Sequence, residues 1–525
     1  MTWIHPISAQ VEETAEVLGG KGYGLVVLRR LGLPVPPGFV ISTAACRAFL
    51  RHGRLPEGLD AELANALAAL EAATGRTLGG TDRPLAVSVR SGSSVSMPGM
   101  MSTVLNLGLT SVATAALAAE TADPRFAFDS RLRFLSSYAT EVLGVDRESL
   151  AAVEHEVSER RSGEAEEWLS EAIRGVAELI RERAGEPVAE DAARDLERAV
   201  AAVFSSLDTP RATTYRELHD IPRDLGTAVI VQAMVFGNRD GRSGTGVAFS
   251  RDPNTGEPVP FGEVLFGHQG EDVVSGRSLT SPLQELADRE PAVWASLLDA
   301  LHRIEAYYRD ACYVEFTFEA GDLWVLQVRP GRLVGRAAVR VAVDLADAGT
   351  IERSEALLRI APQQLHQVRT PRIALDGTAD VLARGLGAFP GVAVGRVATS
   401  ADSAARMAAQ GPVVLVRPQT SPLDMHGLAA AVGVVTSRGG PTSHAAVVAR
   451  SMGKPAVVGA IGLTVDIAVA TVRAGGRSLP EGTLIALGGT SGEVVVGTPP
   501  HRRRRRRPPT APPARLGRRG RRRRR

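Results

Sequence analysis

The stretch from residue 111 to residue 205 constrains the fold most strongly, because it is rich in Ala, Glu, Arg and Leu and contains few Gly or Pro residues. Such a composition favours helices, whereas the residues on either side form short apolar runs separated by glycine-rich turns. The sequence therefore predicts a helical subdomain (111–205) between two strand-rich parts (1–110 and 206–335). We expect a multidomain protein of the α/β and α+β classes.

The second half of the chain predicts three further segments. Residues 336–385 have the pattern of a helical linker. Residues 386–498 alternate strand-like runs such as GPVVLVRP and GTLIALGG with short helices, which indicates a separate small α/β unit. The tail 499–525 contains 14 Arg, 6 Pro and no acidic residue, so we expect it to be disordered. This tail is either an electrostatic tether to polyanions, or an appendage or reading-frame artefact.

Composition excludes several classes of protein. The chain is 44% hydrophobic, but no run approaches the ~18 apolar residues of a membrane span, and the N-terminus lacks the pattern of a secretory signal. Cys46 and Cys312 are the only cysteines, which excludes a disulfide framework and favours the reducing cytoplasm. The net charge of +3 comes from the tail, so it does not indicate a nucleic-acid-binding fold.

Two basic positions near the N-terminus suit a polyphosphate. Lys21, one of only two lysines (the other is Lys454), lies in GGKG just before an expected helix, where backbone amides and an ammonium group can meet phosphate oxygens. Arg90 opens the segment RSGSSVSMPGMM, which presents a guanidinium, hydroxyls and amides together. The alternatives are a glycine-rich turn with an incidental lysine and an ordinary polar turn.

The segment 313–329 predicts a β-hairpin with one polar face. Alternation places Tyr313 and Glu315 on the same face of YVEFTFE, and Gln327 and Arg329 on the same face of LWVLQVR. A turn centred on Gly321 sets Glu315 opposite Gln327, and Tyr313 opposite Arg329. A carboxylate and an amide oxygen side by side can share Mg²⁺. The alternative is a solvated polar face of a sheet.

A histidine at a helix start is the candidate nucleophile. The segment AVGVVTSRGGPTSHAAVVARSMGKPAVVG predicts a strand, a glycine-rich loop, a helix and a strand, with His444 in the first helical turn. A phosphoryl group on this imidazole would meet free backbone amides and Arg438. Imidazole suits phosphoryl relay because it is nucleophilic at neutral pH. The alternative is a capping-region histidine without chemical importance.

Five segments resemble the pyruvate, phosphate dikinase branch of the PEP-utilising enzymes, over residues ~15–498. They are GGKGYGLVVLRRLGLPVPPGF, VRSGSSVSMPGMMSTVLNLGL, VQAMVFGNRDGRSGTGVAFSRDPNTGE, GEDVVSG and SRGGPTSHAAVVARSMGKPAVVG. The resemblance implies an ATP-grasp-type nucleotide domain with a helical insertion, followed by a swivelling phosphohistidine domain. It implies ATP and phosphate as substrates, Mg²⁺ as cofactor, and transfer towards pyruvate or PEP, and it allows a homodimer.

The resemblance also assigns roles to residues. His444 is the residue phosphorylated on Nε2, Arg90 and Arg329 assist catalysis, Glu315 and Gln327 hold the metal, and Thr442 is a regulatory position. The whole ATP–Mg²⁺ site comprises Lys21, Arg90, Glu271, Asp272, Glu315, Gln327 and Arg329.

The chain departs from the family pattern at three places. Tyr313 stands where an acidic residue that pairs with Arg329 is expected, and GEDVVSGRSLTSP deviates after its first half. The family's C-terminal PEP/pyruvate barrel is not in this sequence, so we expect the chain alone to carry only the nucleotide half-reaction, with the acceptor on a separate polypeptide or lost. The alternatives are a degenerate nucleotide-binding paralogue that regulates or scaffolds, and a truncated non-functional product.

Overall fold

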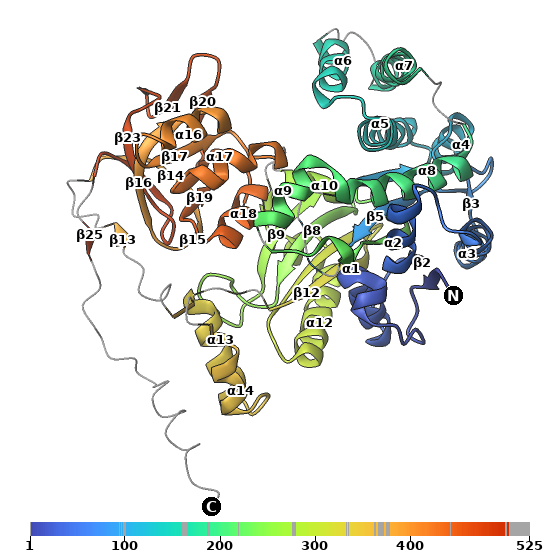
Figure 1. Cartoon of the computed structure of the whole chain (residues 1–525), viewed down its shortest axis with the longest axis horizontal. Coiled ribbons are helices and arrows are strands. Elements are labelled where there is room, and N and C mark those ends of the chain that lie inside the picture. The colour runs from blue at the N-terminus through green and yellow to red at the C-terminus, as the bar shows by residue number, and fades with distance from the viewer. Residues whose placement is uncertain are drawn as a thin grey trace, which may run out of the picture. The chain divides into compact units, whose positions relative to one another are not determined.

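The computed structural model describes residues 2–502 apart from 94, 96, 98–100, 160–164, 186–189, 219, 276–279, 332, 334, 362–363, 366–371, 374–378, 441–442 and 499–500. The chain divides into two compact units. The first comprises Met1–Val235 and Trp324–Gln327, and the second comprises Phe236–Leu323 and Val328–Arg525. Both units mix helices and strands, so the expected mixed α/β class is confirmed (Figure 1).

The first unit is built on a five-stranded antiparallel sheet with the order β1-β2-β7-β5-β6. Its strands are β1 (Ile4–Pro6), β2 (Gly38–Ile41), β5 (Val87–Gly92), β6 (Thr103–Leu107) and β7 (Ala228–Ala233), and a small parallel pair is formed by β3 (Thr77–Leu78) and β4 (Pro84–Leu85). The apolar run of β7 is buried along its whole length, which explains why it reads as continuously hydrophobic rather than alternating.

Within the described residues, five helices occupy the stretch 111–205, which contains few glycine and proline residues. They are α4 (Ser111–Thr121), α5 (Pro124–Glu141), α6 (Arg147–Glu159), α7 (Ala165–Ala184) and α8 (Ala192–Ser205). The other helical segments of this unit are α1 (Ala15–Arg30), α2 (Thr43–His52), α3 (Leu59–Thr74), η1 (Ser206–Asp208), α9 (Pro210–Leu218) and η2 (Arg223–Leu225). Phe134 of α5 and Phe204 of α8 share one core with Val89 and Val231 of the sheet, so the helices and the strands bury their apolar faces together.

The second unit begins with a five-stranded sheet with the order β10-β9-β8-β11-β12. Its strands are β8 (Gly244–Phe249), β9 (Phe261–Phe266), β10 (Ser281–Pro282), β11 (Cys312–Glu319) and β12 (Asp322–Pro330). The accompanying helices are α10 (Gly270–Ser275), α11 (Glu285–Arg289), α12 (Pro291–Tyr308), α13 (Gly335–Asp347) and α14 (Arg353–Leu358). The part predicted to be strand-rich, 206–335, contains β7 to β12, and the predicted hairpin 313–329 is β11 and β12.

An eight-stranded sheet, β14-β24-β23-β16-β17-β18-β19-β15, organises the rest of the second unit, with β16 to β19 parallel. Its strands are β14 (Val381–Arg384), β15 (Leu386–Phe389), β16 (Val392–Ala398), β17 (Val413–Arg417), β18 (Gly433–Thr436), β19 (Ala456–Val458), β23 (Leu484–Gly488) and β24 (Glu493–Val496). The helical segments are α16 (Ala401–Ala408), η3 (Pro422–Asp424), α17 (Met425–Ala430) and α18 (His444–Met452).

Side-chain alternation along β17 divides this region into layers. Val413 and Leu415 pack in the cluster that contains the apolar faces of α16, α17 and α18. Val414 and Val416 pack on the other side, with a three-stranded sheet formed by β20 (Leu463–Asp466), β21 (Thr471–Ala474) and β22 (Arg477–Pro480). The sequence did not predict this small sheet as a separate layer.

The structure differs from two expectations, the helical linker at 336–385 and the disordered tail at 499–525. Residues 336–385 contain α13 and α14 but end in two strands, β13 (Arg372–Ile373) and β14. In the tail, His501–Arg502 form β25 and pair antiparallel with β13, because strand pairing uses backbone groups and needs no apolar periodicity. The remaining tail positions lie outside the described residues. The predicted division of the chain into six segments stays a prediction.

Candidate phosphotransfer site

Lys21 lies inside a helix rather than in a loop, which corrects the expectation for GGKG. Helix α1 runs on both sides of a break at Gly19, whose φ of 68° is left-handed. Glycine is required there, because a Cβ on Gly19 would lie 1.3 Å from the carbonyl oxygen of Gly92 at the end of β5. The backbone N–H of Gly20 donates to the carbonyl oxygen of Ser93 at 3.1 Å. The break therefore holds Lys21 beside the C-terminal end of β5.

Arg90 lies on β5, two residues before Gly92, and is held by a buried glutamine. Its Nη2 donates to Oε1 of Gln232 at 2.5 Å. The amide nitrogen of Gln232 donates in turn to the carbonyl oxygen of Pro36 at 2.9 Å, which fixes the orientation of the amide. The structure thus brings Lys21 and Arg90 to the same end of β5. Sequence reasoning did not single out Gln232, although it is the one polar residue in the otherwise apolar strand AVIVQA.

The two predicted metal ligands, Gln327 and Glu315, belong to different compact units. Gln327 is 2% exposed and belongs to the short segment of β12 that the first unit includes. Glu315 on β11 belongs to the second unit. Asp272 is buried on α10, where its carboxylate accepts from the backbone N–H of Gln269 at 3.3 Å. The side chain of Glu271 and the residue Thr442 lie outside the described part of the structure.

Tyr313, Glu315 and Arg329 lie together on one face of the hairpin. Nη2 of Arg329 lies 3.7 Å from Oε1 of Glu315, and its guanidinium carbon lies 5.8 Å from the ring centroid of Tyr313. The hydroxyl of Tyr313 lies 3.4 Å from Oε1 of Glu315. Burial and the Glu315 carboxylate raise the pKa of Tyr313 well above its ordinary value, so the phenol is neutral. Arg329 therefore lies near the ring of Tyr313 and the carboxylate of Glu315. The family pattern led us to expect an acidic residue at position 313 that pairs with Arg329.

His444 is the first residue of α18, at the C-terminal ends of the parallel strands β17 and β18. Its Nδ1 lies 3.0 Å from Oγ1 of Thr420, and its Nε2 is buried without a hydrogen-bond partner among the described residues. Burial lowers the pKa of His444 to about 4, against the opposing effect of the Asp424 carboxylate, so the ring is neutral at pH 7. When Nδ1–H donates to Thr420, the lone pair of Nε2 is available as a nucleophile.

A short polar network supports Thr420. Asp424 accepts from the backbone N–H of Ser421 at 2.8 Å and lies 3.3 Å from Nη2 of Arg417, so the loop between β17 and α17 is tied at both ends. Ser421 and Asp424 form a capping box around η3. The sequence analysis missed this network, although the segment Ser421-Pro422-Leu423-Asp424 carries the spacing of a capping box. Arg438, which was expected near the phosphoryl group, is exposed.

The second lysine has a structural partner. Nζ of Lys454 donates to the carbonyl oxygens of Leu428 at 2.9 Å and Ala431 at 2.7 Å, and also to that of Ala429. Leu428 and Ala429 lie in the last turn of α17 and Ala431 is its C-cap residue, and carbonyls at a helix end have no partner within their own helix. Three donors on a compact ammonium fit this position, whereas a planar guanidinium does not. Lys454 therefore caps a helix rather than binding phosphate.

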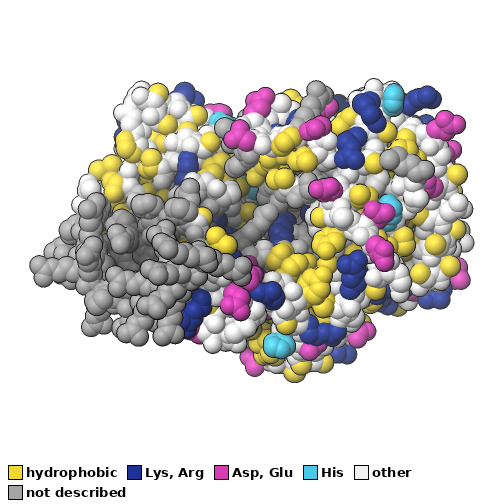
Figure 2. Space-filling view, turned by 60° about the horizontal axis from the view of Figure 1, so that its bottom comes forward, with side chains coloured by type: hydrophobic (Ala, Val, Ile, Leu, Met, Phe, Trp, Pro, Cys, Tyr) yellow, Lys and Arg dark blue, Asp and Glu magenta, His cyan; other side chains and the backbone are white. Residues whose placement is uncertain are grey.

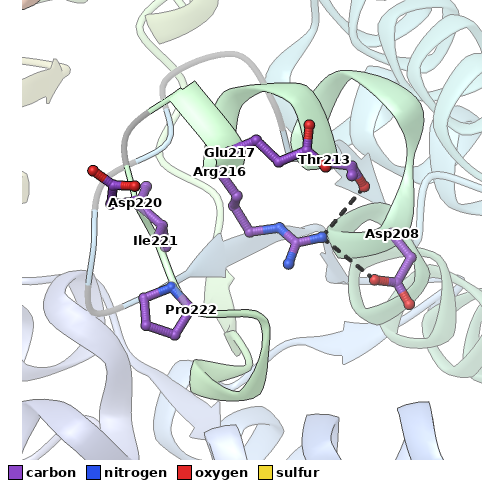
Figure 3. A pocket seen from close by; sticks show the side chains of 7 residues that line it. All are labelled: Asp208, Thr213, Arg216, Glu217, Asp220, Ile221 and Pro222. Atoms are coloured by element: carbon purple, nitrogen blue, oxygen red, sulfur yellow. Dashed lines mark hydrogen bonds and ion pairs between the residues drawn. The ribbon is translucent and has the colours of Figure 1, made fainter.

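A cavity of about 650 Å³ in the first unit contains none of the predicted site residues. Its lining is Asp208, Thr213, Arg216, Glu217, Asp220, Ile221 and Pro222 (Figure 3). Arg216 points towards Asp208 and Thr213, with nitrogen–oxygen distances of 3.6 and 3.3 Å, and it donates to the carbonyl oxygen of Leu207. Because the chain's own oxygens engage this guanidinium, we assign no ligand to the cavity.

Neither the surface charges nor the grouping of metal-binding side chains indicates a further candidate site among the described residues. On the face drawn in Figure 2, basic, acidic and hydrophobic side chains are interspersed. Within the described residues, no three His, Cys, Asp or Glu side chains are grouped so that they could hold a metal ion. Within the same residues, no helix is long and apolar enough to cross a membrane.

Comparison with known proteins identifies two parts of the chain. The family model "Pyruvate phosphate dikinase, AMP/ATP-binding domain" matches residues 15–65 and 51–282. The family model "PEP-utilising enzyme, mobile domain" matches residues 409–492, which include His444. The chain resembles the pyruvate, phosphate dikinase of Rhizobium meliloti (strain 1021), with 44% identity over 518 residues, 94% of this chain and 58% of the relative.

Two other relatives give the same result. The pyruvate, phosphate dikinase 2 of Zea mays is 43% identical over 492 residues (92% of this chain, 56% of the relative), and the Clostridium symbiosum enzyme is 39% identical over 505 residues (94% and 58%). The chain therefore spans a little more than half the length of these relatives. The nucleotide-binding family model alone covers half of the chain, and with these relatives it shows that the chain belongs to the pyruvate, phosphate dikinase family.

Proposed function

We propose that this chain carries out the nucleotide half-reaction of the family: ATP and phosphate react to leave AMP, pyrophosphate and phospho-His444. In this reaction Nε2 of His444 bonds to the β-phosphorus of ATP, and the bonds that join this phosphorus to the α- and γ-phosphates through oxygen break. The γ-phosphoryl group joins phosphate to form pyrophosphate. The observation that carries the proposal is the neutral imidazole of His444, with Nδ1 held by Thr420 and Nε2 without a hydrogen-bond partner among the described residues.

The nucleotide would be bound by an ATP-grasp-type domain. Lys21 and Arg90 at the end of β5 would contact phosphate oxygens, with Glu271 and Asp272 completing the site. Arg329 would stabilise the charge that develops during transfer. The carboxylate of Glu315 and the amide oxygen of Gln327 are hard oxygen donors of the kind that Mg²⁺ takes, and Mg²⁺ would neutralise charge on the phosphates.

The phosphoryl group on His444 would then pass towards pyruvate or PEP. We propose that residues 386–498 act as a swivelling domain, and that the acceptor site lies outside residues 1–498. Thr442, two residues before His444, would be the regulatory position. The reaction would take place in the cytoplasm, and a homodimer is compatible with it.

Labelling with ATP tests the proposal. Wild-type protein incubated with β-³²P-ATP, Mg²⁺ and phosphate should acquire one acid-labile label, and His444→Ala should acquire none while it still binds ATP. γ-³²P-ATP should give labelled pyrophosphate in the presence of phosphate. A stable label from γ-³²P-ATP that survives in His444→Ala would contradict the assignment.

A second candidate function is a regulatory paralogue that binds nucleotide without transferring phosphate. Tyr313 favours it, because this phenol replaces the acid that the family pattern places beside Arg329. ATP binding by calorimetry without any histidine label would support this candidate instead.

A further inference from the structure

Three carboxylates lie on the face of the five-stranded sheet that carries Glu315. Glu263 on β9 and Glu315 on β11 both lie opposite Val247 of β8, so the two belong to one row of the same face. Glu319 lies on this face as well, four positions along β11. Strand spacing and rise set the backbone of Glu315 about 10 Å from that of Glu263 and about 13 Å from that of Glu319.

The two outer carboxylates are held by groups of their own. Oε1 of Glu263 accepts from the hydroxyl of Thr280 at 2.8 Å. Glu319 accepts from Nη1 of Arg239 at 2.6 Å and from the backbone N–H of Phe236 at 3.0 Å. Neither carboxylate can turn towards the middle of the row without breaking these hydrogen bonds. A cation at the central glutamate would therefore find no second carboxylate among these three.

Tyr313 occupies the place beside Glu315 from which a second ligand could come. The two residues are two positions apart on β11 and share a face, and the phenol oxygen lies 3.4 Å from Oε1 of Glu315. The ring packs on Phe249, with a centroid distance of 4.9 Å, which limits its movement. An aspartate at position 313 would offer Mg²⁺ a second anionic oxygen, whereas a phenol is uncharged at neutral pH.

Arg329 makes this group of side chains neutral. Its Nη2 lies 3.7 Å from Oε1 of Glu315, and its guanidinium carbon lies 5.8 Å from the ring centroid of Tyr313. The three side chains together carry one negative and one positive charge. A divalent cation that approaches Glu315 is therefore repelled by the guanidinium and meets no net negative charge. The phosphates of a nucleotide would supply both the missing charge and the missing oxygen ligands.

We propose that Tyr313 makes the cation site on this face dependent on the nucleotide. The free protein binds no Mg²⁺ here; the ion enters with the phosphates of ATP, to which Glu315 adds one carboxylate. The identity of the nucleotide rests on the proposed function. Position 313 thus determines the metal affinity of the free protein, and in place of a second metal ligand the chain holds a guanidinium that can contact phosphate oxygens directly.

Binding of Mn²⁺ in place of Mg²⁺ tests this proposal without turnover. The probe is the relaxation rate of water protons, which rises strongly when Mn²⁺ is bound to a macromolecule and little when it is bound to ATP alone. The parent for all variants is the His444→Ala protein, because it cannot be labelled. Mn²⁺ should leave the relaxation rate of the parent near that of buffer, and addition of ATP should raise it.

Three variants in this parent locate the effect. Tyr313→Asp should bind Mn²⁺ without ATP, about tenfold or more tightly than the parent. Tyr313→Phe keeps the ring and offers no oxygen, so it should behave like the parent. Tyr307→Asp, at an exposed position of α12, adds the same charge elsewhere and is the matched control, which should not bind.

The outcomes separate this proposal from the proposed function. Tight binding of Mn²⁺ by the parent without ATP would overturn the proposal whether or not Tyr313→Asp folds. The proposal also fails if ATP brings no Mn²⁺ to the parent, or if a folded Tyr313→Asp protein binds no better than the parent. If the wild-type protein is not labelled by β-³²P-ATP, the phosphotransfer function fails, while the relaxation experiment still decides the role of Tyr313.

Discussion

The imidazole of His444 depends on one neighbour for its orientation. Thr420 Oγ1, 3.0 Å from Nδ1, keeps Nε2 turned away from this hydrogen bond. Replacing Thr420 with Val removes the oxygen and keeps the shape, so we expect labelling to fall about tenfold to a hundredfold because the nucleophile loses its orientation. ATP affinity should not change. Thr420→Ser is the control and should label nearly normally; an unimpaired Thr420→Val protein would show that the ring is oriented by something else.

The low pKa of His444 makes a prediction about pH. Burial lowers this pKa to about 4, so the ring remains neutral and nucleophilic until the pH falls towards 4. An ordinary histidine would begin to lose its lone pair near pH 6.5. In an NMR titration of histidine-labelled protein, His444 should show no transition between pH 8 and 5. A transition of His444 near 6.5 would refute the prediction.

Asp195 in α8 is a buried carboxyl group, and we expect its replacement to stabilise the protein. This residue is 1% exposed, and burial raises its pKa to about 6. A carboxyl group whose pKa is raised in the folded state destabilises that state above the folded pKa, and the penalty disappears as the pH falls below the unfolded value near 4. Asp195→Asn should therefore raise the free energy of unfolding by about 1–2 kcal/mol at pH 8, and by much less at pH 4.5. Urea denaturation at the two pH values measures this; an equal gain at both would contradict it.

At the scale of single elements, Lys454 is expected to matter for α17. Lys454→Met leaves three carbonyl oxygens without their donor and should lower stability by about 1–3 kcal/mol. Lys454→Arg should not restore the loss, because the guanidinium cannot place three donors at one point. Thermal unfolding of both variants measures the effect. Full stability of Lys454→Arg would show that charge alone suffices.

The sequence predicted elements where periodicity is strong. The runs that became β7, β8, β9, β11 and β12 were identified because alternation or continuous apolar residues mark buried strands. The strands β20 to β22 were missed because each has only four residues, and because the residues between β20 and β21 (467–470, IAVA) are apolar, so no polar turn marks the boundary. The break in α1 was read as a loop, because a single left-handed glycine looks the same in sequence as a turn.

The candidate site could be predicted only in part for a related reason. Tyr313, Glu315 and Arg329 share a face because of local alternation in a hairpin, which sequence shows. Thr420 and His444 are 24 positions apart and meet because β17 and β18 are parallel neighbours, which local patterns do not reveal.

At the scale of the whole molecule, the tail can be divided by a truncation series. Ending the chain after Arg502 retains the pairing of β25 with β13, whereas ending it after residue 498 removes that pairing. We expect the first truncation to leave the melting temperature and His444 labelling unchanged. The second should lower the melting temperature by a few degrees at most, because only two residues pair. A large loss in the first truncation would show that the arginine-rich segment 503–525 contributes to folding.

The close approach of Gly19 to Gly92 has a genetic consequence. At both positions there is no side chain to shorten or repack, since the contact is made by the main chain itself. Any allele that encodes another amino acid at codon 19 must push the start of the Lys21 helix away from the strand of Arg90 until the added Cβ clears the Gly92 oxygen. A compensating change at codon 92 cannot remove a main-chain oxygen. In a library of random variants, codon 19 should therefore yield inactive alleles without second-site revertants at codon 92.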